Sequence, residues 1–199
     1  TYIIQNAYNP RGDYGPSEFD VRHRFVLSGF YQLPFKANRL VAGWEVGTVI
    51  QAQSGNPLNP TLAINPGVSL TVRPDVTGPI RVTGDPAGWF ADKTVFVSPC
   101  VANPAPAPPT CHPGNLSRNA AMGPNFVNTD FSVIKNTKLT ERFNLQFRGE
   151  MFDIFNHPNF GNPVLTTTSS TFGQITGTRF PTGDFGSARQ IQFALKLKF

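Results

Sequence analysis

Arg189-Gln-Ile-Gln-Phe-Ala-Leu-Lys-Leu-Lys-Phe199 alternates between two kinds of side chain along its length. Every odd position from 191 to 199 is apolar, and the even positions carry Gln, Ala or Lys. A strict period of two predicts a β-strand with one apolar face and one polar face. A final strand of this kind that ends on an aromatic residue is typical of transmembrane β-barrels, whose strand residues alternate between lipid and lumen.

The composition of the 199 residues agrees with a β-rich chain. The 18 Gly and 19 Pro disfavour long helices, and an aromatic content of 12% is too high for a disordered chain. No apolar run approaches the ~18 residues of a membrane helix, as expected of strands that present an apolar side chain only at every second position. The sequence starts at Thr1 without a signal-peptide pattern, so we expect a processed product or a piece of a longer chain.

The sequence carries no pattern of an enzyme or of a nucleic-acid-binding protein. Its net charge of +5 comes from scattered basic residues that form no basic helix and no zinc motif. A Gly-x-Ser-x-Gly elbow and a His-Glu-x-x-His motif are both missing from it, and no pair of carboxylates is spaced for acid–base chemistry. We therefore expect a non-enzymatic protein with no cofactor and no metal.

Four further segments alternate as the last one does, at residues 20–33, 44–53, 126–134 and 143–155. Short additional strands are expected at residues 69–73 and 172–178. The connections alternate between short (34–43 and 135–142) and long (54–124 and 156–188), and residues 54–124 are so rich in Pro, Gly and Asn that we expect little regular structure there. Because outer-membrane barrels have short periplasmic turns and long extracellular loops, the long connections are predicted to be extracellular.

The alternation assigns a side to each strand residue. The residues predicted to face lipid are Phe25, Leu27, Val46, Ile50, Phe131, Leu145, Phe147, Phe193, Leu195 and Leu197. The polar residues predicted to face the lumen are Arg24, Glu45, Asp130, Arg148, Glu150 and Lys196. An aromatic girdle at the periplasmic interface is predicted from Tyr31, Trp44, Phe143 and Phe199. Two interpretations of the inward charges are open, a structural ladder or contact with a plug or a passing solute. For the aromatic residues, the alternative is the core of a soluble β-sandwich.

The loop 54–124 holds the other candidate residues. Cys100 and Cys111 predict a disulfide, with free thiols or a metal site that includes His112 as alternatives. Trp89 and Phe90 are candidate ligand contacts because aromatic rings stack on apolar or sugar-like ligands, and the alternative is that they anchor the loop. Outside this loop, the tripeptide Arg11-Gly-Asp13 suggests cell adhesion, but so short a motif also occurs by chance.

Several segments together resemble one family of membrane proteins. They are Phe19-Asp-Val-Arg-His-Arg-Phe25, Gly43-Trp44, Arg148-Gly-Glu-Met-Phe-Asp-Ile-Phe-Asn-His-Pro-Asn-Phe-Gly161, and Arg189 to Phe199. They are similar to the C-terminal part of TonB-dependent outer-membrane receptors of the Oar-like type, and residues 150–161 are the most specific of them. Asp153 stands where Asn is commoner in that family.

The resemblance implies a location in the cell outer membrane and a role in the TonB-dependent uptake of a scarce solute. It implies that residues 1–199 supply the last five or six antiparallel strands of a barrel of about 22 strands. The plug and its TonB-contacting box are not in this sequence, so TonB would act only through that missing region. Expected partners are membrane lipid and, through the last strand, the barrel-assembly machinery. The alternatives are a barrel for surface adhesion or secretion support, and a secreted soluble β-sandwich that binds a ligand.

Overall fold

The computed structural model describes residues 4–6, 8–36, 38–63, 72–104, 107, 110–179 and 188–199. Over these ranges the protein is all-β, with a single 3-10 turn, η1 (Pro10–Asp13), and no α-helix. No helix in the described part of the chain is long and apolar enough to cross a membrane. The chain divides into two compact units, which we call the loop unit (Thr1–Val21, Gly55–Pro124 and Phe160–Gly177) and the sheet unit (Arg22–Ser54, Asn125–Asn159 and Thr178–Phe199).

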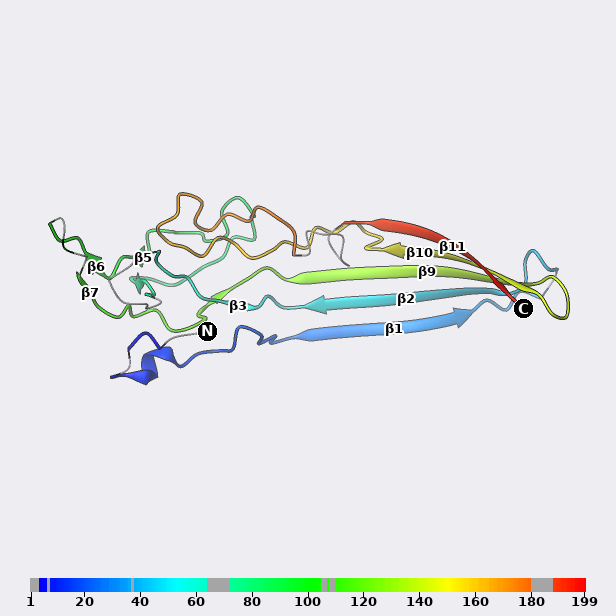
Figure 1. Ribbon diagram of the computed structural model, residues 1–199, viewed down its shortest axis with the longest axis horizontal. Helices are drawn as coiled ribbons and strands as arrows, with labels where there is room; N and C mark the ends of the chain where they lie inside the picture. Colours follow the sequence, from blue (N-terminus) through cyan, green and yellow to red (C-terminus); the bar gives the residue numbers. More distant parts are fainter. Residues whose placement is uncertain are drawn as a thin grey trace. The chain divides into compact units, whose positions relative to one another are not determined.

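The sheet unit is one antiparallel sheet of five strands (Figure 1). Its order is β1 (Arg24–Gln32), β2 (Trp44–Gln53), β9 (Phe126–Lys138), β10 (Asn144–Phe152) and β11 (Gln190–Lys198). β1 and β11 form the two edges, and within the described residues the sheet is not closed into a barrel. The five long strands predicted from alternation are therefore present. The third runs on to Lys138, so the connection expected at residues 135–142 is shorter.

The register of the sheet separates its two faces. Directly paired residues of antiparallel strands point to the same side, so each row of partners belongs to one face. One row runs across all five strands through Tyr31, Val46, Val133, Gly149 and Phe193. The next row points to the other side and runs through Gln32, Glu45, Ile134, Arg148 and Ala194. We call these sides the apolar face and the polar face.

The apolar face is held together by cross-strand contacts and stays exposed. Phe193 covers its partner Gly149, where an added Cβ would lie 3.4 Å from the Phe193 ring. The rings of Phe193 and Phe147 stack with their centroids 5.9 Å apart. Even so, 72% of Phe193 and 68% of Leu195 remain exposed. In a β-sandwich a second sheet would cover such side chains, and in the sheet unit the described residues form no second layer.

The loop unit has a core of its own, which corrects the expectation of little structure at residues 54–124. Buried Leu58, Trp89, Phe90, Ala121 and Phe172 pack together. The rings of Phe90, Phe96 and Phe172 contact one another, with centroids 5.1 to 5.2 Å apart. These residues are scattered among prolines and glycines. They follow neither the two-residue period of a strand nor the 3.6-residue period of a helix, so the sequence does not predict the core.

Three two-residue strand pairs complete the loop unit. β3 (Pro57–Leu58) pairs with β8 (Ala121–Met122), β4 (Asp75–Val76) with β5 (Phe96–Val97), and β6 (Cys100–Val101) with β7 (Thr110–Cys111). The strand expected at residues 172–178 is wrong, because this segment forms turns and a single isolated bridge residue at its end. Most of the strand expected at residues 69–73 lies outside the described residues, and Val72 forms an isolated bridge with Leu62.

Candidate functional site: the polar face of the sheet

The polar face carries a chain of hydrogen bonds near the short turns. Gln32 on β1 donates its side-chain amide to Glu45 on β2 (3.0 Å), and Asn136 on β9 donates to the same carboxylate oxygen (3.4 Å). Gln146 on β10 in turn donates to the side-chain oxygen Oδ1 of Asn136 (2.8 Å). Alternation brings these side chains to one side and the register aligns them, so four neighbouring strands are linked through polar side chains.

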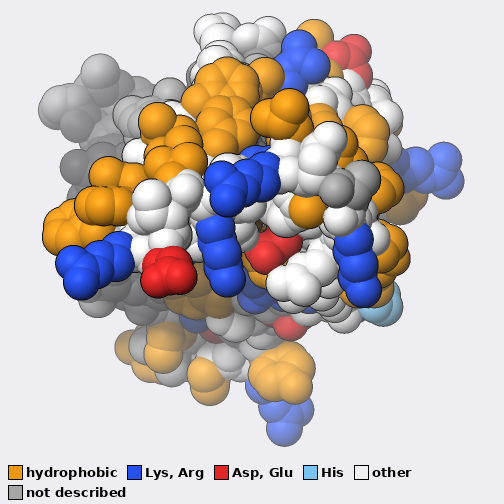
Figure 2. All heavy atoms as spheres, turned by 90° about the vertical axis from the view of Figure 1, so that its right-hand side faces the viewer, with side chains coloured by type: hydrophobic (Ala, Val, Ile, Leu, Met, Phe, Trp, Pro, Cys, Tyr) orange, Lys and Arg blue, Asp and Glu red, His pale blue; other side chains and the backbone are white. Residues whose placement is uncertain are grey.

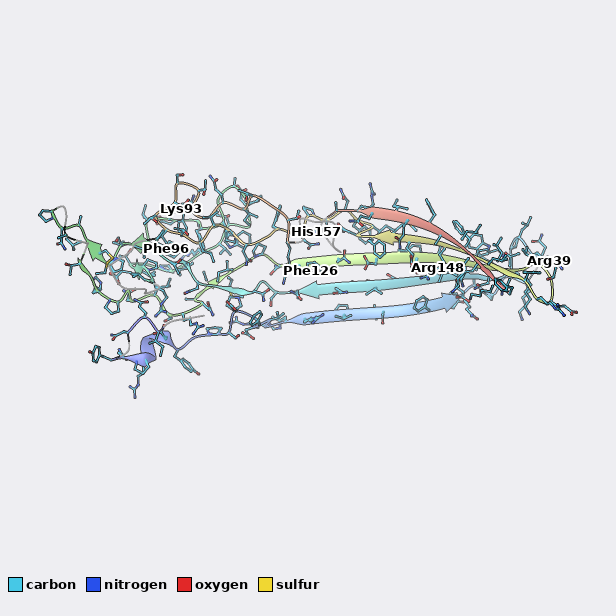
Figure 3. All side chains as sticks on the ribbon, in the orientation of Figure 1. Arg39, Lys93, Phe96, Phe126, Arg148 and His157 are labelled. Carbon is cyan, nitrogen blue, oxygen red and sulfur yellow. A yellow bond between two sulfur atoms is a disulfide. The ribbon has the colours of Figure 1, made fainter. Side chains whose placement is uncertain are left out.

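A second group of charges lies further along the same face. Arg148 forms an ion pair with Glu150 two residues on (2.5 Å), and the other oxygen of Glu150 accepts a hydrogen bond from Gln192 on β11 (2.7 Å). On β9, Asp130 accepts hydrogen bonds from the Asn128 side chain (2.8 Å) and from the backbone N–H of Asp153 (3.1 Å). These contacts hold the Arg148 cation and the carboxylates of Glu150 and Asp130 on the polar face, and Figure 3 labels Arg148 on the sheet.

A hollow of about 190 Å³ opens between these charged groups. Its lining includes apolar Phe30, Val49, Ile134 and Phe152 and polar Asp130, Ser132, Arg148 and Glu150. Phe30 lies over Gly47, where an added Cβ would approach its ring to 2.6 Å, yet 75% of Phe30 is exposed. The buried Nε of Arg148 has no hydrogen-bond partner. Such a surface can contact a group that combines an apolar part with hydrogen-bonding atoms.

Residues 1–192 match the family model described as an outer membrane beta barrel domain. The chain belongs to this family. No curated protein and no solved structure matches the chain. An outer-membrane barrel domain is located in the cell outer membrane, and such families are typically non-enzymatic. Because the chain belongs to this family, the alternative of a secreted soluble β-sandwich is wrong. The uncovered apolar face of the sheet agrees with this conclusion.

The register of this outer-membrane barrel domain brings together the strand residues singled out from the sequence. All six polar ones share the polar face, with Arg24 opposite Gln53 and Lys196 opposite Gln146 near its two ends. The residues that we predict to face lipid all lie on the apolar face. Tyr31, Trp44, Phe143 and Phe199 lie at the end of the sheet that carries the short turns.

The candidate ligand contacts in the loop unit are not available to a ligand. Trp89 is 6% exposed and Phe90 is 3% exposed, because both belong to the core. The indole N–H of Trp89 donates to the carbonyl oxygen of Met122 (2.8 Å). The two rings therefore anchor the loop unit, as the alternative interpretation has it, and their prediction as candidate ligand contacts is corrected.

The cysteines and the adhesion-like tripeptide also have structural roles. Cys100 and Cys111 are joined by a disulfide, and the adjacent His112 contacts Asp75 (2.7 Å). No group of three metal-ligating side chains occurs in the part of the chain that the structure describes. Asp13 of the Arg-Gly-Asp tripeptide forms an ion pair with buried Arg73 (2.6 Å), whose guanidinium also donates to the Gly12 carbonyl (2.9 Å). This tripeptide therefore attaches the N-terminal segment to residues 55–124 within the loop unit.

Two features of the barrel domain are not predicted from the sequence. Buried Asn159 binds the backbone of β9, donating to the Val127 carbonyl (2.9 Å) and accepting from the Val127 N–H (2.8 Å). Phe126 is buried under the guanidinium of Arg179, 5.4 Å from its ring centroid, and burial lowers the pKa of Arg179. Asn159 lies within residues 148–161, the segment that resembles the receptor family, so the resemblance could have pointed to it. Arg179 lies in a long connection without a pattern.

Proposed function

We propose that this chain is the C-terminal barrel segment of a TonB-dependent outer-membrane receptor of the Oar-like type. The observation that carries the proposal is a five-stranded sheet with an uncovered apolar face and a charged polar face, in which β1 and β11 end the strand order among the described residues. In lipid, unpaired strand edges leave backbone groups unsatisfied, at a cost of several kcal/mol for each group. The sheet therefore needs further strands on both sides, as a segment of a barrel of about 22 strands would have.

The two faces have separate roles in this proposal. The apolar face contacts the hydrocarbon of the membrane, and the polar face lines the lumen. The Arg148–Glu150 pair and the hollow beside Phe30 then face the plug or a solute that passes it. The folded loop unit, with its disulfide, lies on the extracellular side, where disulfides persist.

The segment works with parts that lie outside this sequence. Energy would reach it from TonB through the plug region, and the last strand would be recognised by the barrel-assembly machinery. A role in surface adhesion is the other candidate, and its clearest sequence motif, Arg11-Gly-Asp13, has its aspartate occupied by the ion pair with Arg73.

Uptake by the full-length protein tests the proposal. A strain that lacks the gene is compared with the complemented strain for growth on a panel of scarce large solutes, with and without functional TonB. We expect at least one solute whose uptake needs both the receptor and TonB. Equal uptake of every solute by all strains, or uptake that is unaffected by loss of TonB, would contradict the proposed function.

A further inference from the structure

The connection between β1 and β2 combines basic and apolar side chains at one end of the apolar face. Its exposed residues include Phe35, Lys36, Arg39 and Leu40, and Leu40 is 80% exposed. Residues 33–44 contain no carboxylate. We call the described residues 33–36 and 38–43 the basic turn. Figure 2 shows Lys and Arg side chains over this end of the sheet unit, with hydrophobic side chains among them and Asp or Glu side chains between them.

Several hydrogen bonds order the backbone of the basic turn. The side chain of Asn38 accepts hydrogen bonds from the N–H groups of Leu40 (3.1 Å) and Val41 (3.0 Å). The backbone carbonyl of Asn38 accepts from Ala42 (2.8 Å), and Leu33 donates to the Trp44 carbonyl (2.9 Å). These hydrogen bonds order the backbone around Arg39, and Lys36 lies three positions earlier in the same turn.

Two residues of the apolar face hold the basic turn in place. Trp44 and Lys135 are direct partners on β2 and β9, and the Lys135 ammonium lies 5.5 Å from the Trp44 ring centroid. Lys135 donates to the backbone carbonyls of Arg39 (2.9 Å) and Ala42, and the Trp44 indole donates to the Leu40 carbonyl (3.1 Å). The turn is therefore attached to the side of the sheet that carries Phe147 and Leu197, and Figure 3 shows Arg39 at this end.

We propose that the basic turn binds the phosphate headgroups of anionic phospholipids, with Lys36 and Arg39 as the cationic groups. Exposed cations beside an aromatic and apolar boundary match a lipid whose headgroup is anionic and whose chains cover the apolar face. A basic residue near an anionic headgroup is attracted to it, and the attraction weakens as salt screens the charges. The inference requires the location in the outer membrane and a lipid-facing apolar face, and it is independent of which solute, if any, is transported.

Photo-crosslinking of the full-length protein in vesicles tests this inference. Phosphatidylcholine vesicles contain a trace of phosphatidylglycerol or of phosphatidylcholine that carries a photoreactive group near the headgroup, and cross-linked peptides are mapped by mass spectrometry. We expect the peptide with residues 33–43 to be labelled about fivefold more by phosphatidylglycerol, and this ratio to fall in 0.5 M salt. In the double variant Lys36→Gln/Arg39→Gln, the ratio should fall close to one.

A matched control removes the same charge from the other end of the sheet. The variant Arg22→Gln/Arg24→Gln should keep the preference of the wild-type basic turn, and Lys36→Arg/Arg39→Lys should keep it as well. Equal labelling by the two lipids in the wild-type protein would overturn the inference. An equal loss of preference in both neutral variants would also overturn it, because net charge and not the basic turn would then be responsible. Uptake assays are not involved, so failure here is distinct from failure of the proposed function.

Discussion

Phe147 and Leu195 lie directly opposite each other on β10 and β11, and the next pair, Arg148 and Ala194, points to the other face. If the first pair contacts the bilayer interior, Leu195→Arg should lower the free energy of unfolding by about 2–4 kcal/mol. Equilibrium unfolding in urea of the full-length protein, reconstituted in vesicles, measures this loss.

The matched control for Leu195→Arg is Gln192→Arg on the same strand. Gln192 lies on the polar face opposite Glu150, so the new guanidinium meets a carboxylate and should cost less than about 1 kcal/mol. Ala194 is less suitable for this purpose, because an arginine there would face Arg148. Equal losses for the two Arg variants would contradict the assignment of faces.

The loop unit depends on Phe90, whose ring contacts Phe96 and Phe172. Phe90→Ala should destabilise the loop unit by about 3–5 kcal/mol, as is usual when a buried aromatic side chain is removed. Limited proteolysis should then cut within residues 72–104 much sooner than in the wild-type protein. A variant with unchanged protease resistance would show that the core is not what holds the loop unit together.

The disulfide closes a short segment of the same unit, with a sequence separation of 11 between Cys100 and Cys111. Replacing both by Ser should destabilise the loop unit by about 3 kcal/mol in the loop-entropy model. Hydrogen exchange would register this as faster exchange in residues 96–101 and 110–116, while the strands of the sheet unit keep their protection. Unchanged exchange in the double variant would contradict the expected contribution.

How much of this structure the sequence predicts depends on the kind of signal. Alternation predicts β2 at its observed bounds, because apolar and polar positions alternate over most of its length, with Thr48 and Val49 as exceptions. It does not predict the last residues of β9, where polar residues follow one another from Lys135 to Lys138. The core around Trp89 is also missed, since its members come from four separate segments and share no period.

Lys135 is the position at which the alternation rule conflicts with the chemistry of the side chain. The register puts this lysine on the apolar face, where the period calls for an apolar residue. The carbonyls of the basic turn and the Trp44 ring satisfy its charge at the end of the sheet. The alternation predicts on which face such a residue lies. Tertiary contacts determine whether its charge is stabilised there.

Asp92 provides a pH-dependent reporter in the loop unit. A hydrogen bond from the Thr94 hydroxyl (2.6 Å), and then one from the Thr94 N–H (2.8 Å), lower the pKa of this exposed carboxylate. Because the folded pKa lies below the unfolded one, the contribution to stability is present above the unfolded pKa and is lost as the pH falls through the folded value. Thr94→Val should raise the pKa of Asp92, which NMR titration of its carboxyl carbon measures. An unchanged pKa would mean that the hydroxyl does not stabilise the ionised form.

The central claim is that lipid contacts one face of the sheet and water contacts the other. Nitroxide labels placed singly at each position of β11 (Gln190–Lys198) in the full-length protein test it in reconstituted vesicles. Collision with oxygen, which concentrates in lipid, is compared with collision with a water-soluble nickel complex. We predict a period of two, with oxygen contact highest at 191, 193, 195 and 197 and nickel contact highest at the even positions. Equal accessibility of odd and even positions to both reagents would contradict the account.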